Sequence, residues 1–347
     1  MNRTFLDALE CRPSSRIPFI PAIYEHKAWF VDSIPSTVCR DAGLLTQAII
    51  TEYEQVRPDA LVVGMDVYNV EAEAVGCRIA YYEGDDHSIP SPIPGEELFH
   101  EDDPIASLKM PDPSRDGRMP LMIEVARRVR KLIGDELPIR GAVSAPFSFA
   151  ANVAGAQNLF LLIATRPEVV QALLAYAVDV IGRYSLAFIE SGCEVIMFDS
   201  LASPQLMSPL MYRNLVLPPT TELIGRLHSA GMKHVPLIIG GNTTNILDTY
   251  LETGANNILC DDAADMGAFL SACSKVSRAF RRNISTSDFL TATPDELQRR
   301  AVVEMTAAQG YPGFIFGTGV VPFGTPLNNL VALREAVSEF SASKPKT

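Results

Sequence analysis

The chain has 347 residues, of which 47% are hydrophobic and 20% are charged, a balance typical of a globular protein with a sizeable core. Its formal net charge of −12 excludes a general electrostatic attraction to nucleic acid or to an anionic membrane. The N-terminal segment carries Asp7 and lacks the apolar stretch of a signal peptide, and no run approaches the roughly 18 apolar residues of a spanning helix. The six cysteines have neither C-x-x-C spacing nor the density of a disulfide framework. These features predict a cytoplasmic protein without nucleic-acid or membrane partners.

The first third of the chain predicts two strands, over 17–23 and 60–63, separated by an amphipathic helix around Leu45 and Ile49. A stretch over 103–117 that is rich in Pro, Asp and Gly is typical of a long surface excursion within one domain.

From about residue 137 onward, short β-rich runs alternate with longer helical patterns, as in βαβ units with a parallel sheet. The expected strands cover 137–143, 194–198, 234–239, 256–259, 276–280 and 313–316. Thr293-Pro294-Asp295-Glu296 has the sequence of a helix N-terminus with a capping box. The total approaches eight strands and predicts an α/β fold, a (β/α)8 TIM barrel in a single domain over 1–340, followed by a frayed tail over 341–347. A doubly wound open sheet is the alternative, but no glycine-rich dinucleotide fingerprint follows a strand.

Working residues of a (β/α)8 barrel lie at the C-terminal ends of its strands. Polar and titratable residues follow most of the expected strands and would form an acidic mouth. They are Tyr24, Glu25, His26, Asp66, Tyr68, Asn69, Ser144, Asp199, Asn242, Cys260 and Asp261.

Several of these residues also have a purely structural interpretation. Asp199 would equally cap the following turn, and Glu25 and His26 would point to opposite faces if their segment were extended. Cys260 would be a small buried hydrophobic residue.

Four further titratable residues are expected to be structural. His228 and His234 flank a connection on the opposite face of the barrel, and Glu71 and Glu73 suit the first turn of a helix.

Five segments in order along the chain resemble the uroporphyrinogen decarboxylase-like superfamily. They are ALVVGMDVYNVEAEAVGC at 60–77, Ser144-Ala145-Pro146-Phe147, VIMFDSLASPQLMSPLMYRNLVLPP at 195–219, Gly241-Asn242-Thr243, and GFIFGTGVVPFGTPLNNLVAL at 313–333. The resemblance covers almost the whole chain and implies a (β/α)8 barrel enzyme.

The decarboxylase branch of this superfamily neutralises a substrate with eight carboxylates by means of an arginine-rich loop after the first strand. In this chain the loop at 21–28 contains Lys27 as its only firm cation, although Asp66 matches the branch's pyrrole-binding aspartate. An acidic loop on an acidic protein disfavours a polyanionic substrate.

The methylcobamide:coenzyme M methyltransferase branch binds zinc through a His-x-Cys pair before the Gly-Asn turn and a cysteine in the closing strand. The corresponding positions here are Ile238 and Gly240, and the closing segment 317–320 has no cysteine. The usual zinc site is therefore absent, and zinc stays uncertain. Weak candidates for a different metal site are Glu25, His26, Cys260 and Asp261.

The resemblance then implies a methyltransferase that moves a methyl group from a small methylated substrate, a methoxylated aromatic compound or a methylamine, to the cobalt of a separate corrinoid-binding protein. We expect Glu25 and His26 to supply the proton for the leaving group, with Asp66, Tyr68 and Asp199 as the other catalytic candidates. The substrate-binding candidates are Tyr24, Asn69, Phe147, Met197 and Asn242. The alternatives are a decarboxylase of a smaller carboxylate and a non-catalytic barrel that binds a corrinoid or porphyrin protein.

Overall fold

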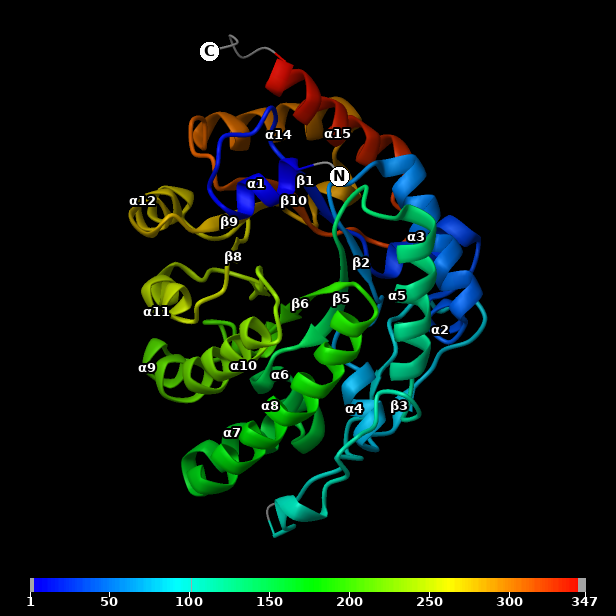
Figure 1. Cartoon of the computed structure of the whole chain (residues 1–347), viewed down its shortest axis with the longest axis vertical. Coiled ribbons are helices and arrows are strands. Elements are labelled where there is room, and N and C mark those ends of the chain that lie inside the picture. The colour runs from blue at the N-terminus through cyan, green and yellow to red at the C-terminus, as the bar shows by residue number, and fades with distance from the viewer. Residues whose placement is uncertain (1–2, 101, 343–347) are drawn as a thin grey trace.

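The computed structural model describes residues 3–100 and 102–342, and eight parallel strands form its central sheet, in the order β1-β10-β9-β8-β7-β6-β5-β2 (Figure 1). The strands are β1 (Phe19–Ala22), β2 (Leu61–Val63), β5 (Ile139–Ser144), β6 (Glu194–Phe198), β7 (Pro236–Ile238), β8 (Asn257–Cys260), β9 (Ala279–Ile284) and β10 (Phe314–Val320). The two end strands, β1 and β2, meet through Asp59. Its backbone N–H donates to the Phe19 carbonyl (2.9 Å), and its carboxylate accepts from the Phe19 N–H (2.7 Å). The predicted (β/α)8 barrel is confirmed.

Helices surround the strands and cover the outer face of the barrel, while inward-facing side chains fill its interior. The main ones are α3 (Ala42–Val56), α5 (Met119–Ile133), α8 (Pro167–Glu190), α10 (Leu217–Ser229), α11 (Leu247–Glu252), α12 (Met266–Val276), α14 (Pro294–Ala307) and α15 (Leu327–Ala342). Shorter ones that position the site are α1 (Thr4–Leu9), η1 (Glu25–Val31), α4 (Val70–Val75) and α6 (Pro146–Ala154). The predicted capping box at the start of α14 is confirmed, with Thr293 and Glu296 bonding to each other's backbone N–H.

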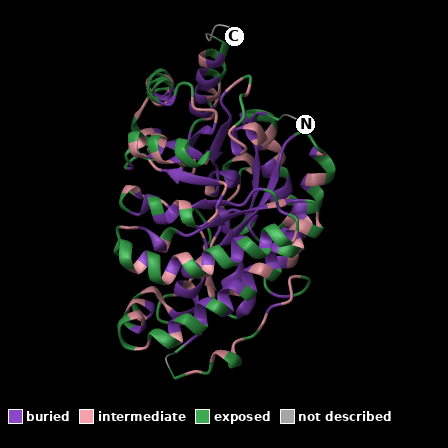
Figure 2. Cartoon of the chain, turned by 60° about the vertical axis from the view of Figure 1, so that its left-hand side comes forward, coloured by how far each residue is buried: buried purple, intermediate pink, exposed green. Residues whose placement is uncertain are grey.

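Side chains alternate along each strand between the inside of the barrel and the layer beneath the helices. In β6, Val195 and Met197 belong to the large outer cluster, whereas Ile196 and Phe198 belong to a smaller cluster inside the barrel. Burial is therefore complete through the middle of the molecule and falls off on the outer helix faces (Figure 2).

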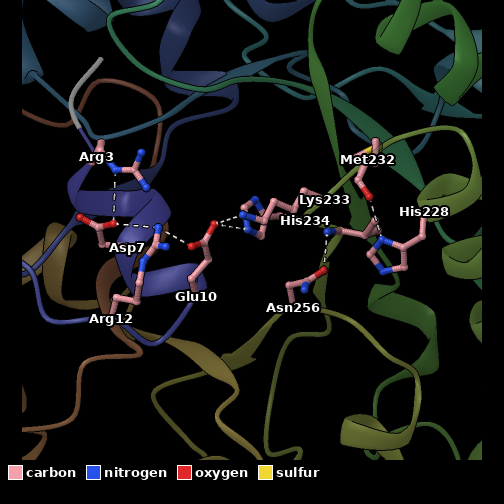
Figure 3. A network of polar contacts seen from close by, with 10 residues as sticks. Arg3, Asp7, Glu10, Arg12, His228, Met232, Lys233, His234 and Asn256 are labelled. Atoms are coloured by element: carbon pink, nitrogen blue, oxygen red, sulfur yellow. Dashed lines mark hydrogen bonds and ion pairs between the residues drawn. The ribbon is translucent and has the colours of Figure 1, made fainter.

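The N-terminal helix α1 closes the floor of the barrel. Phe5 is fully buried among inward-facing residues from the starts of the strands, such as Ile20 and Ile315. On the same face, Lys233 donates to the carboxylate of Glu10, and His234 Nε2 lies 3.5 Å from it (Figure 3).

The two histidines expected on this structural face do lie there. His228 Nδ1 is bonded to the Met232 carbonyl (2.8 Å) in the turn before β7 (Figure 3).

Three expectations about the elements need correction. The strand expected at 276–280 in fact covers Ala279–Ile284, so it carries Arg281 and Asn283 inside the barrel. Helix α8 is long and apolar enough by composition to cross a membrane, which the sequence pattern did not indicate; in the fold its buried face packs on β5, β6 and α10. Helix α15 continues through Ala342, into the predicted tail, and 343–347 lie outside the described residues.

Candidate active site

Three aromatic rings from different strand ends meet at the C-terminal mouth of the barrel. Tyr24 follows β1 and sets its ring edge-on to Phe198 at the end of β6, with 5.6 Å between centroids. Tyr68 follows β2 and contacts the same ring at 6.1 Å. These rings cover the apolar cluster that fills the barrel. The expected proximity of strand-end residues is thus realised by Tyr24 and Tyr68.

Glu25 and His26 open the 3₁₀ helix η1 immediately after Tyr24. Glu25 is partly buried, its Oε2 has no hydrogen-bond partner among the described residues, and burial raises the pKa of its carboxyl group. His26 is fully buried, edge-on to Phe30 at 4.9 Å, and burial lowers the pKa of its imidazole to about 4. At neutral pH the ring is uncharged and is a poor proton donor, so of the two residues only Glu25 has the chemistry of a general acid.

Lys27 does not face the mouth. Its side chain is fully buried, donates to the Ile23 carbonyl and lies 3.4 Å from a carboxylate oxygen of Glu52 on α3. The loop after β1 therefore presents no ammonium group to a substrate.

Asp66 is held in a buried ion pair with Arg118, at 2.5 Å between Nη1 and Oδ2. Arg118 also bonds to Glu73, whose other oxygen accepts from Tyr81 Oη (2.9 Å). Burial raises the pKa of Asp66 and the guanidinium of Arg118 opposes that shift. Glu73 thus has a larger role than the expected helix-terminus charge, because it helps to fix the segment that carries Tyr68.

Asp199 follows β6 and is fully buried. Its Oδ1 accepts from the N–H and the hydroxyl of Ser148, at 2.9 and 2.7 Å, while Oδ2 has no hydrogen-bond partner within the described chain. Burial raises the pKa of this carboxyl to about 7. Asp199 does cap a helix, but the helix is α6 on the neighbouring strand's loop and not the turn that follows Asp199 itself.

The other predicted substrate-binding residues are not brought to the barrel interior. Asn69 is buried and donates to the Pro90 carbonyl, and exposed Asn242 accepts from Thr244 N–H within its own turn (3.1 Å). Phe147 and Met197 are fully buried in the outer cluster, because each occupies a position that faces the helices.

The weak metal candidates at the end of β8 are occupied by protein contacts. Cys260 is fully buried, contacts Arg282 (3.6 Å), and has its thiol pKa raised by burial to about 12. Asp261 accepts from Gly241 N–H (2.8 Å) and from Asn283 Nδ2 (3.1 Å). Within residues 3–100 and 102–342, no three or more His, Cys, Asp or Glu side chains gather closely enough to hold a metal ion.

The positions of the superfamily's zinc ligands do not fit zinc either. Ile238 belongs to the apolar cluster inside the barrel, and the Gly240 carbonyl already accepts a bond from Ser203 (3.1 Å).

Sequence reasoning missed two arginines inside the barrel and one glutamate at its rim. Arg140 and Arg281 are 1% and 3% exposed. A Cβ atom at Gly317 would lie 2.7 Å from the Arg281 side chain, so this glycine of β10 makes room for the arginine. Glu71 is buried, accepts from Ser144 N–H (2.7 Å), and has its pKa raised to about 7 by burial. The sequence did contain a signal for the two arginines, because a buried arginine in an otherwise apolar strand is unusual unless it has a binding partner.

A barrel of eight parallel strands whose mouth gathers buried carboxyl and aromatic side chains has the architecture of a (β/α)8-barrel enzyme. The family model described as uroporphyrinogen decarboxylase (URO-D) matches residues 1–340, and the chain belongs to this family.

Similar proteins come from two functional groups. A uroporphyrinogen decarboxylase of Koribacter versatilis is 29% identical over 88% of this chain and 85% of its own length. The methylcobamide:CoM methyltransferase MtbA of Methanosarcina acetivorans is 33% identical over 60% of this chain and 59% of its own. A solved methyltransferase from Methanosarcina mazei shares the fold with a TM-score of 0.85, covering 98% of each chain at 21% identity. The superfamily resemblance is confirmed, and the protein is an enzyme of this decarboxylase and methyltransferase superfamily.

Proposed function

We propose that this protein is a corrinoid-dependent methyltransferase that takes a methyl group from a methoxylated aromatic compound or a methylamine and passes it to cobalt(I) of a separate corrinoid protein. The observation that carries the proposal is Glu25, a partly buried carboxyl group of raised pKa with an unpartnered oxygen beside the barrel mouth. Burial favours the protonated form of this carboxyl group, which is the form that can protonate a leaving oxygen or nitrogen.

The proposed transfer breaks the bond between the methyl carbon and the leaving atom and forms a bond between that carbon and cobalt. The carbon–oxygen bond of a methyl ether breaks with its electron pair on oxygen, and cobalt(I) of the partner provides the pair that bonds to the methyl carbon. Glu25 gives its proton to the oxygen, so the product leaves as a neutral alcohol or phenol.

The remaining side chains would position the substrate. Tyr24, Tyr68 and Phe198 offer aromatic surface to a ring substrate. Asp66 and Asn69 act through the backbone, because their bonds to Arg118 and Pro90 fix the segment that carries Tyr68. Asp199, with a pKa near neutrality, is a second proton reservoir.

An exposed aromatic group next to the mouth supports a protein partner. Trp29 on η1 is 50% exposed and sets its ring edge-on to Phe323 at 5.5 Å, and His87 stacks on Phe323 at 3.9 Å. Aromatic side chains are enriched in protein interfaces. Trp29 and Glu25 belong to the same helix η1, so a corrinoid protein docked here would lie next to the segment that carries Glu25.

The test replaces Glu25 with Gln and follows the anaerobic absorbance change from cobalt(I) to methyl-cobalt(III) with a panel of methoxylated aromatics and methylamines. We expect a loss of about 10²-fold or more, the usual scale for a missing general acid. Glu54→Gln, on the exposed face of α3, is the matched control and should leave the rate unchanged. A Glu25→Gln variant as fast as the parent would remove Glu25 from the mechanism and direct the search to Asp199.

A decarboxylase of a smaller carboxylate is the second candidate, favoured by the two buried arginines inside the barrel. Such an enzyme would act without a corrinoid partner. Release of carbon dioxide from a small acid in the absence of cobalt(I), together with an unreactive methyl-donor panel, would replace the first proposal with this one.

A further inference from the structure

Two guanidinium groups lie inside the barrel without a carboxylate bound to either. Arg281 projects from β9 and Arg140 from β5, and neither makes an ion pair within 4.0 Å in the described part of the chain. Nε of both residues and Nη2 of Arg140 have no hydrogen-bond partner among the described residues. Buried charged donors in this state are costly, because desolvation is offset only when they are paired.

The nearest acidic group does not balance them. Glu194 stands opposite Arg140 in the parallel register, yet its own Oε2 is also buried without a partner. Arg140 additionally lies 4.9 Å over the ring of Phe5 on the barrel floor. Glu194 partly offsets the charge of Arg140, whereas Arg281 has no carboxylate within 4.0 Å among the described residues.

Some solvent-accessible surface remains along the inner wall of the barrel, although the Nε atoms of both arginines and Nη2 of Arg140 are themselves closed off from solvent. Inward-facing Val62, Ala142 and Ile238 retain 6–8% of their surface, whereas their outward-facing strand neighbours Leu61, Val143 and Leu237 retain none. Asn283 Oδ1 is another unpartnered polar atom on the same strand as Arg281.

Tyr24 connects this interior with the mouth. Burial raises the pKa of its phenol, and the positive charges of Arg281 and then Arg140 oppose that shift, so both guanidinium groups lie within electrostatic reach of the ring. Glu25 is the next residue in the chain. The charge of Glu25 acts on the Tyr24 phenol in the opposite direction, so the ring of Tyr24 lies within electrostatic reach of both the arginines and Glu25.

We propose that Arg281, with Arg140 beneath it, binds a carboxylate of the substrate inside the barrel, so that the methyl donor is a small monocarboxylic acid such as a methoxybenzoate. This inference rests on the proposed methyl transfer. The planar guanidinium fork matches a carboxylate in a bidentate arrangement. With the carboxylate at Arg281, the aromatic ring lies against Tyr24 and the methoxy group points to Glu25 and the mouth.

The experiment is calorimetric binding to the full-length protein without any corrinoid, with benzoate, 4-methoxybenzoate and neutral methoxybenzene as probes. We expect both carboxylates to bind and methoxybenzene to bind at least about 10-fold more weakly, the scale of a charged hydrogen bond. Arg281→Met should lower carboxylate affinity about 10- to 100-fold, and Arg281→Lys should restore part of it. Arg299→Met, the same change at an exposed position, should have no effect.

Melting temperatures separate a binding role from a structural one. Benzoate should raise the melting temperature of the parent but not of Arg281→Met. Without ligand, Arg281→Met should be at least as heat-stable as the parent, because it removes a buried cation that bonds to Tyr24 but has no carboxylate within 4.0 Å among the described residues.

Equal affinity for methoxybenzene and methoxybenzoate, or unchanged benzoate affinity in Arg281→Met, would overturn the carboxylate site. If Arg281→Met proves to be destabilised, the folded variant Arg281→Lys serves as the test instead. Carboxylate binding by Arg281→Lys that is no tighter than that by Arg281→Met would also overturn the carboxylate site. Carboxylate binding that depends on Arg281, with no methyl transfer from any probe, would uphold the site and refute the proposed function instead.

Discussion

Glu25 and His26 are adjacent in sequence, and burial favours the uncharged form of each: it raises the pKa of the carboxyl and lowers that of the imidazole. The polarity of the pair predicted two proton donors. In the structure only Glu25 remains a candidate proton donor, because the side chain of His26 is fully buried and packs against Phe30. The sequence contains no local signal that would have shown which of the two is enclosed.

Asp199 gives a pH-dependent prediction at the same scale. Its pKa is raised from 3.8 to about 7 on folding, so the native state binds a proton that the unfolded chain releases above about pH 4. Its contribution to stability therefore decreases as the pH rises from about 4 to 7. Asp199→Asn mimics the protonated form and keeps an acceptor for Ser148. We expect the melting temperature of the variant to fall less than that of the parent between pH 5 and 8; parallel curves would show that Asp199 is not the titrating group.

At the scale of elements, η1 is attached to α3 by the buried pair of Lys27 and Glu52, whose side chains are 0% and 3% exposed. Sequence analysis treated Lys27 as the only firm cation of the loop at 21–28, which corresponds to the arginine-rich loop of the decarboxylase branch. A 3₁₀ helix has three residues per turn, and here it turns Lys27 toward α3. The direction of a side chain in such a short segment depends on tertiary packing, which a periodicity cannot show.

Breaking this pair should destabilise the protein strongly. Glu52→Gln leaves a buried ammonium group without its counter-charge, at an expected cost of about 3–5 kcal/mol in the free energy of unfolding. The double variant Lys27→Met with Glu52→Leu should recover most of that loss, because it removes both charges. Urea denaturation of the single and double variants measures the difference, and a double variant no more stable than Glu52→Gln would contradict the pairing.

The boundaries of β9 show the limit of strand prediction from sequence. The sequence pattern predicted a strand over 276–280, whereas β9 covers Ala279–Ile284. Two arginines continue the strand, Arg281 inward and Arg282 outward to Glu304. A rule that places arginine at the surface fails here, because the side chain of Arg281 lies inside the barrel.

For the whole molecule, the alternation of strands and helices predicted a parallel sheet with helical crossovers, closed as a barrel or open and doubly wound. The count of nearly eight strands and the family resemblance favoured the barrel, which the structure confirms. The sequence pattern did not predict how the N-terminal end of the barrel is closed. Helix α1 precedes the first strand, and its Phe5 fills the N-terminal end of the barrel beneath Arg140.

The N-terminal segment is held to the barrel by the buried ring of Phe5 and by the bond between Glu10 and Lys233, and we expect these two contacts to differ in strength. Phe5→Ala removes a fully buried ring and should lower the free energy of unfolding by about 3–5 kcal/mol. Lys233→Ala breaks the bond to Glu10 seen in Figure 3, but the lysine side chain is 69% exposed, so we expect a change below about 1 kcal/mol. Chemical denaturation checks both, and a larger effect at Lys233 than at Phe5 would show that the floor is held by charge.

The junction of β1 and β2 has a consequence for motion. The side chain of Asp59 joins these strands, and β2 has only three residues, so this seam has fewer ladder bonds than the pair β5 and β6. Tyr24 stands on one side of the seam and Tyr68 on the other. Transient opening there would part the aromatic cover and admit a ligand without unfolding the barrel. In hydrogen–deuterium exchange we expect the amides of β1 near Phe19 and of β2 to exchange before those of β5 and β6, and Asp59→Asn to increase that difference. Uniform protection around the barrel would mean that entry depends on side-chain motion alone.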